Sequence, residues 1–352
     1  MQGRHRDGNA GDHEPDLALA RRFTWSAKGL RHGTGDVDDN ASLPPKWCSC
    51  ARCPHFTRFA RAVGRIRWAA KPVTDPECDQ TAQHREITIS VPLVTVLLPS
   101  LRVDAWLKRS LESILCDGYP RIEVILLLDG IMDVPAESWL HDPRVIIVPL
   151  GPRGGIVRAL NIGLGMATSE FIARMDGDDI SLNGRLRAQV DFMQANLRVA
   201  VLGCQAVRID EHERSLGRLD MPLSDSAIKR RLLVRNSMVH PTIMFRKSAV
   251  LEVGGYSAAA KTTEDYDLYL RLALNYDFAN LADCYLQYRV HSGQVSRGFT
   301  PFSADKWTLV RRRQRLARSL KRPFVIQIAR DILWYVAQLA RYLGLREKWW
   351  RK

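Results

Sequence analysis

The chain has 352 residues, enough for two domains or for one large domain with appendages, and its 46% apolar and 26% charged composition is typical of a globular protein. It has no uninterrupted apolar run of about 18 residues and no apolar segment of a signal peptide at its start, so we expect neither a transmembrane helix nor a secretory leader. The net charge of +14 comes mostly from the end: residues 306–352 carry 14 Lys and Arg against 2 Asp and Glu, whereas residues 86–305 carry 24 against 26. A basic tail beside a neutral centre favours contact with an anionic surface, either membrane or nucleic acid.

Residues 1–91 are expected to form an extension of low order, because Gly, Asp, Arg and Pro are frequent there and apolar periodicity is weak. A short basic helix is expected within it over Arg58–Lys71. Four candidate zinc ligands stand together in the block "CSCARCPH": Cys48, Cys50, Cys53 and His55. Structural zinc sites usually pair two knuckles and the second is missing, so free thiols are the alternative. The seven cysteines are odd in number and scattered, which fits reduced thiols of a cytosolic protein better than disulfides.

From about residue 92 the elements follow one another as in an α/β protein. Short apolar runs that end in Pro, Gly or Asp predict buried strands at Leu93–Ser100, Ile122–Gly130, Val145–Leu150 and Glu170–Met175. Apolar residues at helical spacing predict helices at Ala105–Leu115 and Gly154–Ala167. This order predicts a mostly parallel sheet flanked by helices, in which ligands bind at the carboxyl ends of the strands.

Carboxylates stand at two of these strand ends. Asp129 closes the second strand, and Asp176, Asp178 and Asp179 follow the fourth. Carboxylates spaced D-x-D can present oxygens to one hard divalent cation, Mg²⁺ or Mn²⁺, which removes the repulsion that otherwise raises one carboxyl pKa. The alternative for Asp179 is the N-cap of a helix that is expected to begin near Leu182. Capping explains one carboxylate of the three, so we interpret the cluster as a site for a metal and a diphosphate.

One long segment, "EFIARMDGDDISLNGRLRAQVDFM", carries the cluster, and six others accompany it in a fixed order. They are "LESIL", "EVILLLDG", "RALNIGL", "MVHPTIMFRKSAVLEVGGY", "TEDYDLYLRLA" and "YRVHSGQVS". Together these segments resemble glycosyltransferase family 2, the inverting GT-A-fold enzymes that use nucleotide-diphosphate sugars and a D-x-D motif. The resemblance implies a GT-A domain over residues 92–300, with a Rossmann-like, mostly parallel central sheet and flanking helices. The extension of residues 1–91 precedes this domain, and a basic helical tail of residues 301–352 follows it.

The resemblance assigns the donor side of the site. Asp176 and Asp178 match the D-x-D pair, which contacts the nucleotide ribose and the divalent cation. Asp129 matches an acidic residue near the nucleotide base, and Pro99 ends the first strand in the same pocket. Two departures leave the identity of the base open, because the family often has Asp-Asp-Gly-Ser where this chain has Leu128–Ile131, and Pro-x-Tyr-Asn or similar where it has Pro99–Arg102.

The resemblance also assigns the chemistry. Asp265, in the pair Glu264-Asp265, matches the general base, and His291 matches a position near the diphosphate and metal. The leaving nucleoside diphosphate gains charge that the metal stabilises, while a carboxylate takes the proton of the acceptor hydroxyl. One base opposite the leaving group implies a single displacement with inversion. The alternative is that both acids only complement the N-terminal dipole of a helix that begins there.

Several other residues have two interpretations. His240 either touches the acceptor or is a hydrogen-bonded structural histidine. Cys204 and Cys284 stand in apolar contexts and are most simply core residues. Arg153 and Arg158 flank a glycine pair and either meet phosphate or lie on a solvated helix face.

The tail combines a basic stretch, Lys306–Arg322, with an amphipathic one, Pro323–Leu345. The expected apolar face of the second stretch is Val325, Ile328, Ile332, Val336, Leu339 and Leu343, and the opposite face is Gln327, Arg330, Gln338 and Arg341. With Trp349 and Trp350 near the end, this predicts an interfacial helix on an anionic membrane and a peripheral location on its cytoplasmic face. The alternative is a helix packed on the catalytic domain.

The predicted partners are thus a nucleotide-diphosphate sugar, a hydroxyl acceptor on a cell-surface polysaccharide or lipid-linked glycan, and an anionic membrane. Three other classes compete. The first is a nucleotidyltransferase, which needs no base at Asp265. The second is a non-catalytic sugar-nucleotide-binding relative, which needs no intact metal and base carboxylates. The third is a nucleic-acid-binding protein, which leaves the acidic motifs unexplained and would need a recognisable nucleic-acid-binding module that the tail lacks.

Overall fold

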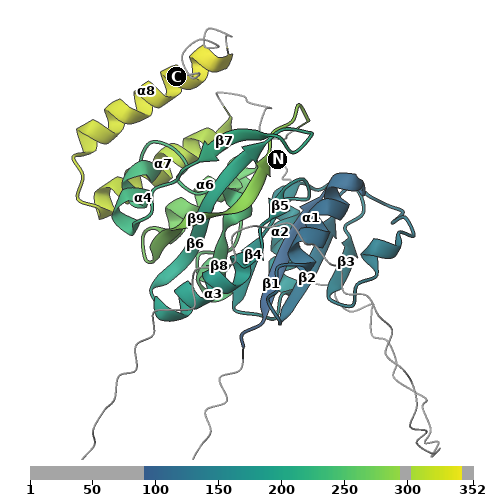
Figure 1. The fold of residues 1–352 in the computed structure, drawn as a ribbon. Coiled ribbons are helices and arrows are strands. Elements are labelled where there is room, and N and C mark those ends of the chain that lie inside the picture. Colours follow the sequence, from purple (N-terminus) through teal and green to yellow (C-terminus); the bar gives the residue numbers. More distant parts are fainter. Residues whose placement is uncertain (1–90, 294–302, 343–352) are drawn as a thin grey trace, which may run out of the picture. The chain divides into compact units, whose positions relative to one another are not determined.

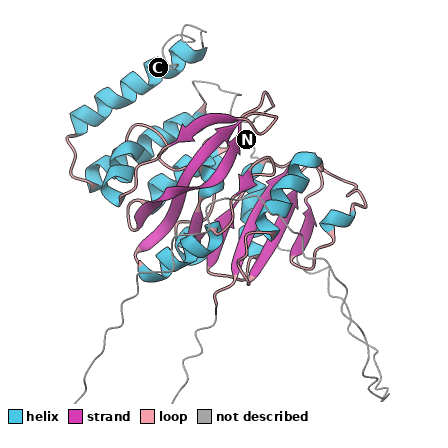
Figure 2. Cartoon of the chain, viewed as in Figure 1, coloured by secondary structure: helices cyan, strands magenta, loops and turns pink. Residues whose placement is uncertain are grey.

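A computed structural model describes residues 91–293 and 303–342 of the chain, drawn in colour in Figure 1 and by element type in Figure 2. The expected basic helix over Arg58–Lys71 and the candidate zinc ligands lie outside the described residues. The strands are β1 (Val94–Ser100), β2 (Ile122–Leu128), β3 (Val145–Pro149), β4 (Phe171–Arg174), β5 (Ile180–Ser181), β6 (Val199–Ile209), β7 (Ser215–Leu219), β8 (Met244–Arg246) and β9 (Asp277–Arg289).

The helices cover both faces of this sheet (Figure 2). They are α1 (Ala105–Leu115), α2 (Ile156–Met166), α3 (Arg185–Ala195), α4 (Asp225–Leu232), α5 (Lys247–Glu252), α6 (Glu264–Leu272), α7 (Ala304–Ser319) and α8 (Phe324–Tyr342). Three short 3₁₀ helices, η2 (Ser138–Leu140), η3 (His240–Thr242) and η4 (Ala258–Ala260), complete the described elements. Every strand and helix expected between residues 93 and 175 is present within two residues of its predicted ends.

The strands form one sheet in the order β3-β2-β1-β4-β8-β6-β9-β5, with β7 paired to β6. β1, β2, β3 and β4 pair in parallel, as does β6 with β9, so most paired residues lie in parallel ladders. β8 runs antiparallel between β4 and β6 and joins the two parallel parts. Because β1 and β4 are neighbours in parallel, their carboxyl ends meet at one edge, and the expected α/β architecture with a GT-A-like sheet is confirmed.

Two apolar cores lie on opposite faces of the sheet, and β2 contributes to both. Ile125 and Leu127 belong to one core, whereas Val124, Leu126 and Leu128 belong to the other, as the side-chain alternation of a strand requires. The first core also receives side chains from α7, beyond the residues where we expect the chemistry to end: Leu309, Leu316 and Ala317. The boundary between residues 300 and 301 stays a prediction, but α7 packs as part of the catalytic domain.

The two tail helices differ in what they bury. α7, the helix of the basic stretch, packs on α6 and η4. α8 packs on α7 with polar side chains, because Gln327 and Asp331 are buried while Val325 and Leu333 are 77% and 67% exposed. The amphipathic helix is therefore present as predicted, with its apolar face directed away from the described residues. No helix in the described ranges is long and apolar enough to span a bilayer.

Candidate active site

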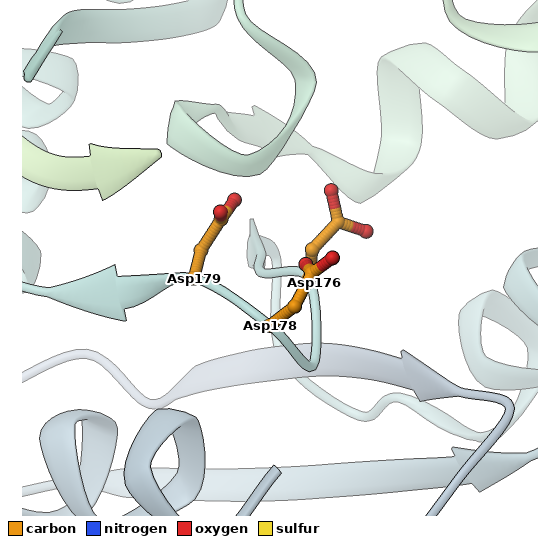
Figure 3. Close-up of side chains that lie close together, drawn as sticks. All are labelled: Asp176, Asp178 and Asp179. Atoms are coloured by element: carbon orange, nitrogen blue, oxygen red, sulfur yellow. The ribbon is translucent and has the colours of Figure 1, made fainter. Parts of the chain in front are cut away.

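The loop between β4 and β5 carries the three carboxylates, whose side chains point to the same side of the loop in Figure 3. One oxygen of each of Asp176, Asp178 and Asp179 lies within 4.8 Å of the others. Gly177 lets the loop pass close to β1, because a Cβ there would lie only 3.0 Å from the Ser100 hydroxyl. The D-G-D spacing thus combines two carboxylates with a turn that a larger residue would obstruct.

Asp178 and Asp179 are held by β9 and the residues that follow it. The backbone N–H of Arg289 donates to Asp179 Oδ1 at 2.8 Å, and its side-chain Nε donates to the carbonyl of Asp178 at 2.8 Å. His291 donates from Nε2 to Asp178 Oδ2 at 2.8 Å and accepts at Nδ1 from the N–H of Gly293. In this tautomer His291 orients Asp178, and direct coordination of a metal by Nε2 would need the ring proton to move. Its role as a ligand stays a prediction.

The capping interpretation of Asp179 is wrong. α3 begins at Arg185, not near Leu182, and its N-cap is Gly184 in a left-handed conformation without a side-chain cap. Asp179 instead precedes the two-residue strand β5, where burial and the neighbouring carboxylates Asp176 and Asp178 raise its pKa well above the usual range. The sequence analysis placed the start of the helix three residues too early, because it did not identify Gly184 as the N-cap.

Arg174 is a site residue that our sequence analysis overlooked. It is the last residue of β4, it is 4% exposed, and its Nη1 forms an ion pair with Asp176 Oδ2. In the segment "FIARMD", Arg174 is the only charged residue of an apolar strand, and it stands two residues before Asp176. A charged residue in a buried strand needs a partner of opposite charge, so the sequence could have indicated that Arg174 belongs to the site. Burial raises the pKa of Asp176, and Arg174 opposes that rise.

The pair Glu264-Asp265 opens α6, within the first turn where acids complement the helix dipole. Asp265 does more than that, because its Oδ2 accepts from Asn236 Nδ2 at 2.6 Å while its Oδ1 accepts from the N–H of Tyr266 at 2.6 Å. Burial raises the pKa of Asp265, and burial together with Asp265 raises the pKa of Glu264 to about 8. The charge of Asp176 adds a smaller contribution to the raised pKa of Glu264.

α7 fixes this helix from behind. Asp267 is fully buried and accepts from Arg271 Nε at 2.7 Å and from Arg312 Nε at 3.2 Å. Arg271 also donates to the carbonyls of Val253 and Gly255. A segment that our sequence analysis assigned to the tail therefore helps to hold the helix of the predicted base.

The donor-side residues lie at the same sheet edge. Pro99 is buried near the end of β1, and the N–H of Asp129 donates to the carbonyl of Ser100 at 3.0 Å. Both carboxylate oxygens of Asp129 accept backbone N–H groups at the start of α2, from Gly154 at 2.7 Å and Gly155 at 2.8 Å. Asp129 thus stabilises the N-terminus of α2 in this structure, and its contact with a nucleotide base stays a prediction, as does that of Pro99.

The residues with two interpretations are now placed. His240 is buried and bonds through Nε2 to the Tyr256 hydroxyl at 3.0 Å, as a structural histidine does, and burial holds its pKa well below the usual range. Cys204 is buried as expected, whereas Cys284 on β9 is half-buried. Arg158 is exposed and donates to the carbonyl of Leu150, which fits the solvated helix face.

The carboxylate cluster fits a divalent cation. Three carboxylates supply the hard oxygen ligands that Mg²⁺ and Mn²⁺ prefer, and Asp179 Oδ2 is buried without a hydrogen-bond donor among the described residues. An unpaired buried carboxylate oxygen is costly, and a cation would remove that cost together with the repulsion that raises the pKa of Asp179.

Comparisons with known proteins agree with this geometry. The profile of the family described as Glycosyl transferase family 2 matches residues 95–254. The amylovoran biosynthesis glycosyltransferase AmsE of Erwinia amylovora is 34% identical over 197 residues, which cover 54% of this chain and 73% of the relative. The O-antigen biosynthesis glycosyltransferase WbnJ of Escherichia coli is 32% identical over 214 residues, which cover 58% and 82%. The chain therefore belongs to glycosyltransferase family 2.

The fold has a counterpart among solved structures. S. aureus TarS 1-349 in complex with UDP-GlcNAc matches with a TM-score of 0.53 at 15% identity, over 73% of this chain and 76% of the TarS 1-349 chain. This likeness supports the GT-A fold. The family profile ends before Glu264, Asp265 and His291, so the roles of these three residues rest on their motifs and on the contacts described above.

Proposed function

We propose that this glycosyltransferase moves a sugar from a nucleotide-diphosphate donor to a hydroxyl acceptor with inversion, assisted by a divalent cation. The observation that carries the proposal is the cluster of three carboxylates in the D-x-D loop, where the buried Arg174 forms an ion pair with Asp176. The acids of α6 lie near enough to Arg174 that its positive charge lowers the pKa of Glu264 and Asp265. A metal and diphosphate site close to a base is what a single displacement requires.

Asp178, Asp179 and the free oxygen of Asp176 would hold the cation, which would supply charge stabilisation for the diphosphate leaving group. Asp265 takes the proton of the attacking hydroxyl. Asn236 fixes the orientation of its carboxylate, and a pKa raised by burial makes the ionised form a stronger base. Glu264, half-buried beside it with a pKa of about 8, is protonated at neutral pH and can donate a hydrogen bond to the acceptor.

The names of the relatives support the acceptor class. AmsE belongs to amylovoran biosynthesis and WbnJ to O-antigen biosynthesis, and TarS was crystallised with UDP-GlcNAc. We therefore place this chain in the synthesis of a cell-surface polysaccharide or lipid-linked glycan, with a nucleotide sugar as the donor.

A panel of UDP-, GDP- and dTDP-sugars tests the donor class. The full chain is mixed with each donor and Mn²⁺ or Mg²⁺, and released nucleoside diphosphate is measured. We expect release from one nucleotide class, its loss in EDTA, and its recovery when the cation is restored. Release from no donor, or full release in excess EDTA, contradicts the proposal.

We also propose that the enzyme works at the cytoplasmic face of an anionic membrane, bound there through α8. The exposed side chains of this helix are mostly apolar: Phe324, Val325, Ile326, Ile328, Ile332, Leu333, Val336 and Tyr342. The apolar face of α8 cannot rotate toward the domain, because the polar face of the helix is bonded to it. Asp331 forms a buried ion pair with Arg313 at 3.0 Å, and Gln327 donates to the carbonyl of Leu233 at 3.0 Å.

The charge around this apolar face fits anionic lipid. The exposed charged residues described between 306 and 342 are all basic: Arg311, Arg315, Arg318, Lys321, Arg322 and Arg330. The one acid in that range, Asp331, is buried and paired. Each basic residue near an anionic surface contributes on the order of 1 kcal/mol, and the apolar side chains add burial.

Vesicle sedimentation tests this location. The full chain should sediment with phosphatidylglycerol-containing vesicles and be released as salt rises, because salt screens the charges. Ile332→Gln with Leu333→Gln should weaken binding strongly without unfolding the protein, since both side chains are exposed. Leu197→Gln is the matched control, because Leu197 is an equally exposed leucine after α3. Equal binding by the double variant, or concentration-dependent dimers in place of vesicle binding, contradicts the location.

A further inference from the structure

The buried guanidinium of Arg174 forms an ion pair with Asp176 of the D-x-D loop, and its positive charge also lowers the pKa of Glu264 and Asp265 on α6. It lies at the end of β4, and Asp176, two residues later, takes its Nη1 in an ion pair. Nothing among the described residues accepts a hydrogen bond from its Nε. Packing alone does not explain a buried arginine that lies beside carboxylates and has an Nε–H without an acceptor among the described residues.

The pairing with Asp176 divides the D-x-D cluster. Oδ2 of Asp176 is occupied by Arg174, which leaves its other oxygen and the carboxylates of Asp178 and Asp179 for a cation. Asp178 is oriented by His291, and Asp179 keeps one buried oxygen unpaired. The cluster therefore offers a divalent cation about two net negative charges instead of three.

We propose that Arg174 is a positioning residue of the catalytic centre, a built-in cation that orients Asp176 and limits how tightly the carboxylate cluster holds its divalent metal. This inference rests on the proposed metal site. In the enzyme without donor or metal, Arg174 offsets the repulsion among the acids of the D-x-D loop and of α6. With a metal and diphosphate bound, Arg174 would still hold one oxygen of Asp176 and would thereby limit the affinity of the cluster for the cation.

Arg174→Met tests the proposal, because methionine retains much of the length and none of the charge. Without metal, the variant should unfold on the order of 10 °C below wild type, since a carboxylate is left without its buried partner. It should bind Mn²⁺ alone, measured by calorimetry, roughly tenfold more tightly, because Asp176 is freed and a positive neighbour is gone. Mn²⁺ should therefore raise its unfolding temperature by more than it raises that of wild type.

Arg313→Met is the matched control. Arg313 is also fully buried and also paired with one aspartate, Asp331, but it lies between α7 and α8. It should lower the unfolding temperature comparably and leave Mn²⁺ affinity unchanged. If both variants bind Mn²⁺ as wild type does, Arg174 is only structural and the proposal is wrong.

Arg174→Lys keeps the proposal testable if the methionine variant does not fold. Lysine retains the charge and loses the planar fork that orients Asp176. We expect near wild-type Mn²⁺ affinity, a kcat lower by roughly 10- to 100-fold and a KM for the donor changed much less. Mn²⁺ affinity raised by the lysine variant, or a kcat equal to that of wild type, would overturn the proposal. A double variant with Asp176→Asn should show little further loss of kcat, because the pair acts as one unit; fully additive losses count against it.

Discussion

The active site is rich in acidic residues and the C-terminal helices are rich in basic residues. Each region contains one buried residue of the opposite charge that forms an ion pair with one of the others. At the D-x-D loop and α6, the buried Arg174 pairs with Asp176, and its charge lowers the pKa of Asp179, Glu264 and Asp265. At α7 and α8, many basic residues surround one buried aspartate, Asp331. In each region the buried residue forms an ion pair with one residue of opposite charge, Asp176 in the active site and Arg313 in the tail. The other carboxylates are then free for the proposed cation, and the other basic residues for the proposed anionic surface.

The two regions differ in what they leave unsatisfied. The active site keeps a buried carboxylate oxygen on Asp179 that has no donor among the described residues. Four of its carboxyl groups have raised pKa values with burial as the first cause: Asp176, Asp179, Glu264 and Asp265. The tail leaves apolar side chains such as Val325 and Leu333 exposed, while its charges are solvated or paired. The first kind of deficit is relieved by a small hard ion, and the second by a lipid surface.

The largest effect is expected from Asp178, which lies on a loop at the edge of the sheet. Asp178→Ala should abolish divalent-dependent turnover while leaving the unfolding temperature close to that of wild type, because the side chain contacts His291 and no apolar core. Nucleoside diphosphate release and thermal unfolding measure both effects. Turnover near the wild-type level in this variant would remove Asp178 from the metal site.

On the tail side, Asp331 is the residue whose loss should cost most. Asp331→Ala leaves the buried Arg313 without its acidic partner, which typically destabilises a protein by about 3–5 kcal/mol. Chemical unfolding monitored by circular dichroism measures the loss. Replacing both residues with leucine should recover part of it, because two apolar side chains leave no unpaired charge. If Asp331→Ala has no effect on stability, α8 is not fixed by its polar side, and the outward apolar face loses its explanation.

A smaller effect distinguishes Glu264 by its pH dependence. Its pKa in the folded protein is about 8, above the ordinary value of 4.5, so its protonated form favours the fold. The stability that it contributes is present below pH 4.5 and is lost as pH rises through about 8. In EDTA, Glu264→Gln should therefore match wild type near pH 4 and become more stable than wild type as pH rises toward 9. A difference in unfolding temperature that does not change with pH would show that Glu264 is not perturbed.

Local patterns predicted the α/β part of the chain well. The strands near Leu97 and Ile125 are short, apolar and bounded by turn residues, and α1 was expected at Ala105–Leu115, where it lies. The D-x-D loop, the acids at the start of α6 and His291 were found by motif. The contacts among these residues could not be predicted, because the hydrogen bonds of His291 with Asp178 and of Asn236 with Asp265 join residues far apart in the sequence.

The tail shows where periodicity stops being informative. The sequence of α8 shows an apolar face and a polar face, but it does not say which one faces the domain. That choice depends on Arg313 and the carbonyl of Leu233, which supply buried partners for Asp331 and Gln327. The same limit explains Arg174, since its role depends on α6, which follows it by about 90 residues in the chain.

The most direct test of the account is to measure donor affinity and turnover of Asp265→Asn in the same preparation. Asparagine keeps the size of the side chain and one oxygen that can accept from the N–H of Tyr266, but it cannot take the proton of the acceptor hydroxyl. Transfer should fall by roughly 10²–10⁴ while the dissociation constant of the nucleotide sugar, measured with Mn²⁺, stays close to that of wild type. If donor binding is lost together with transfer, or if transfer persists at the wild-type rate, Asp265 is not the base and the two acidic segments do not form the catalytic centre described here.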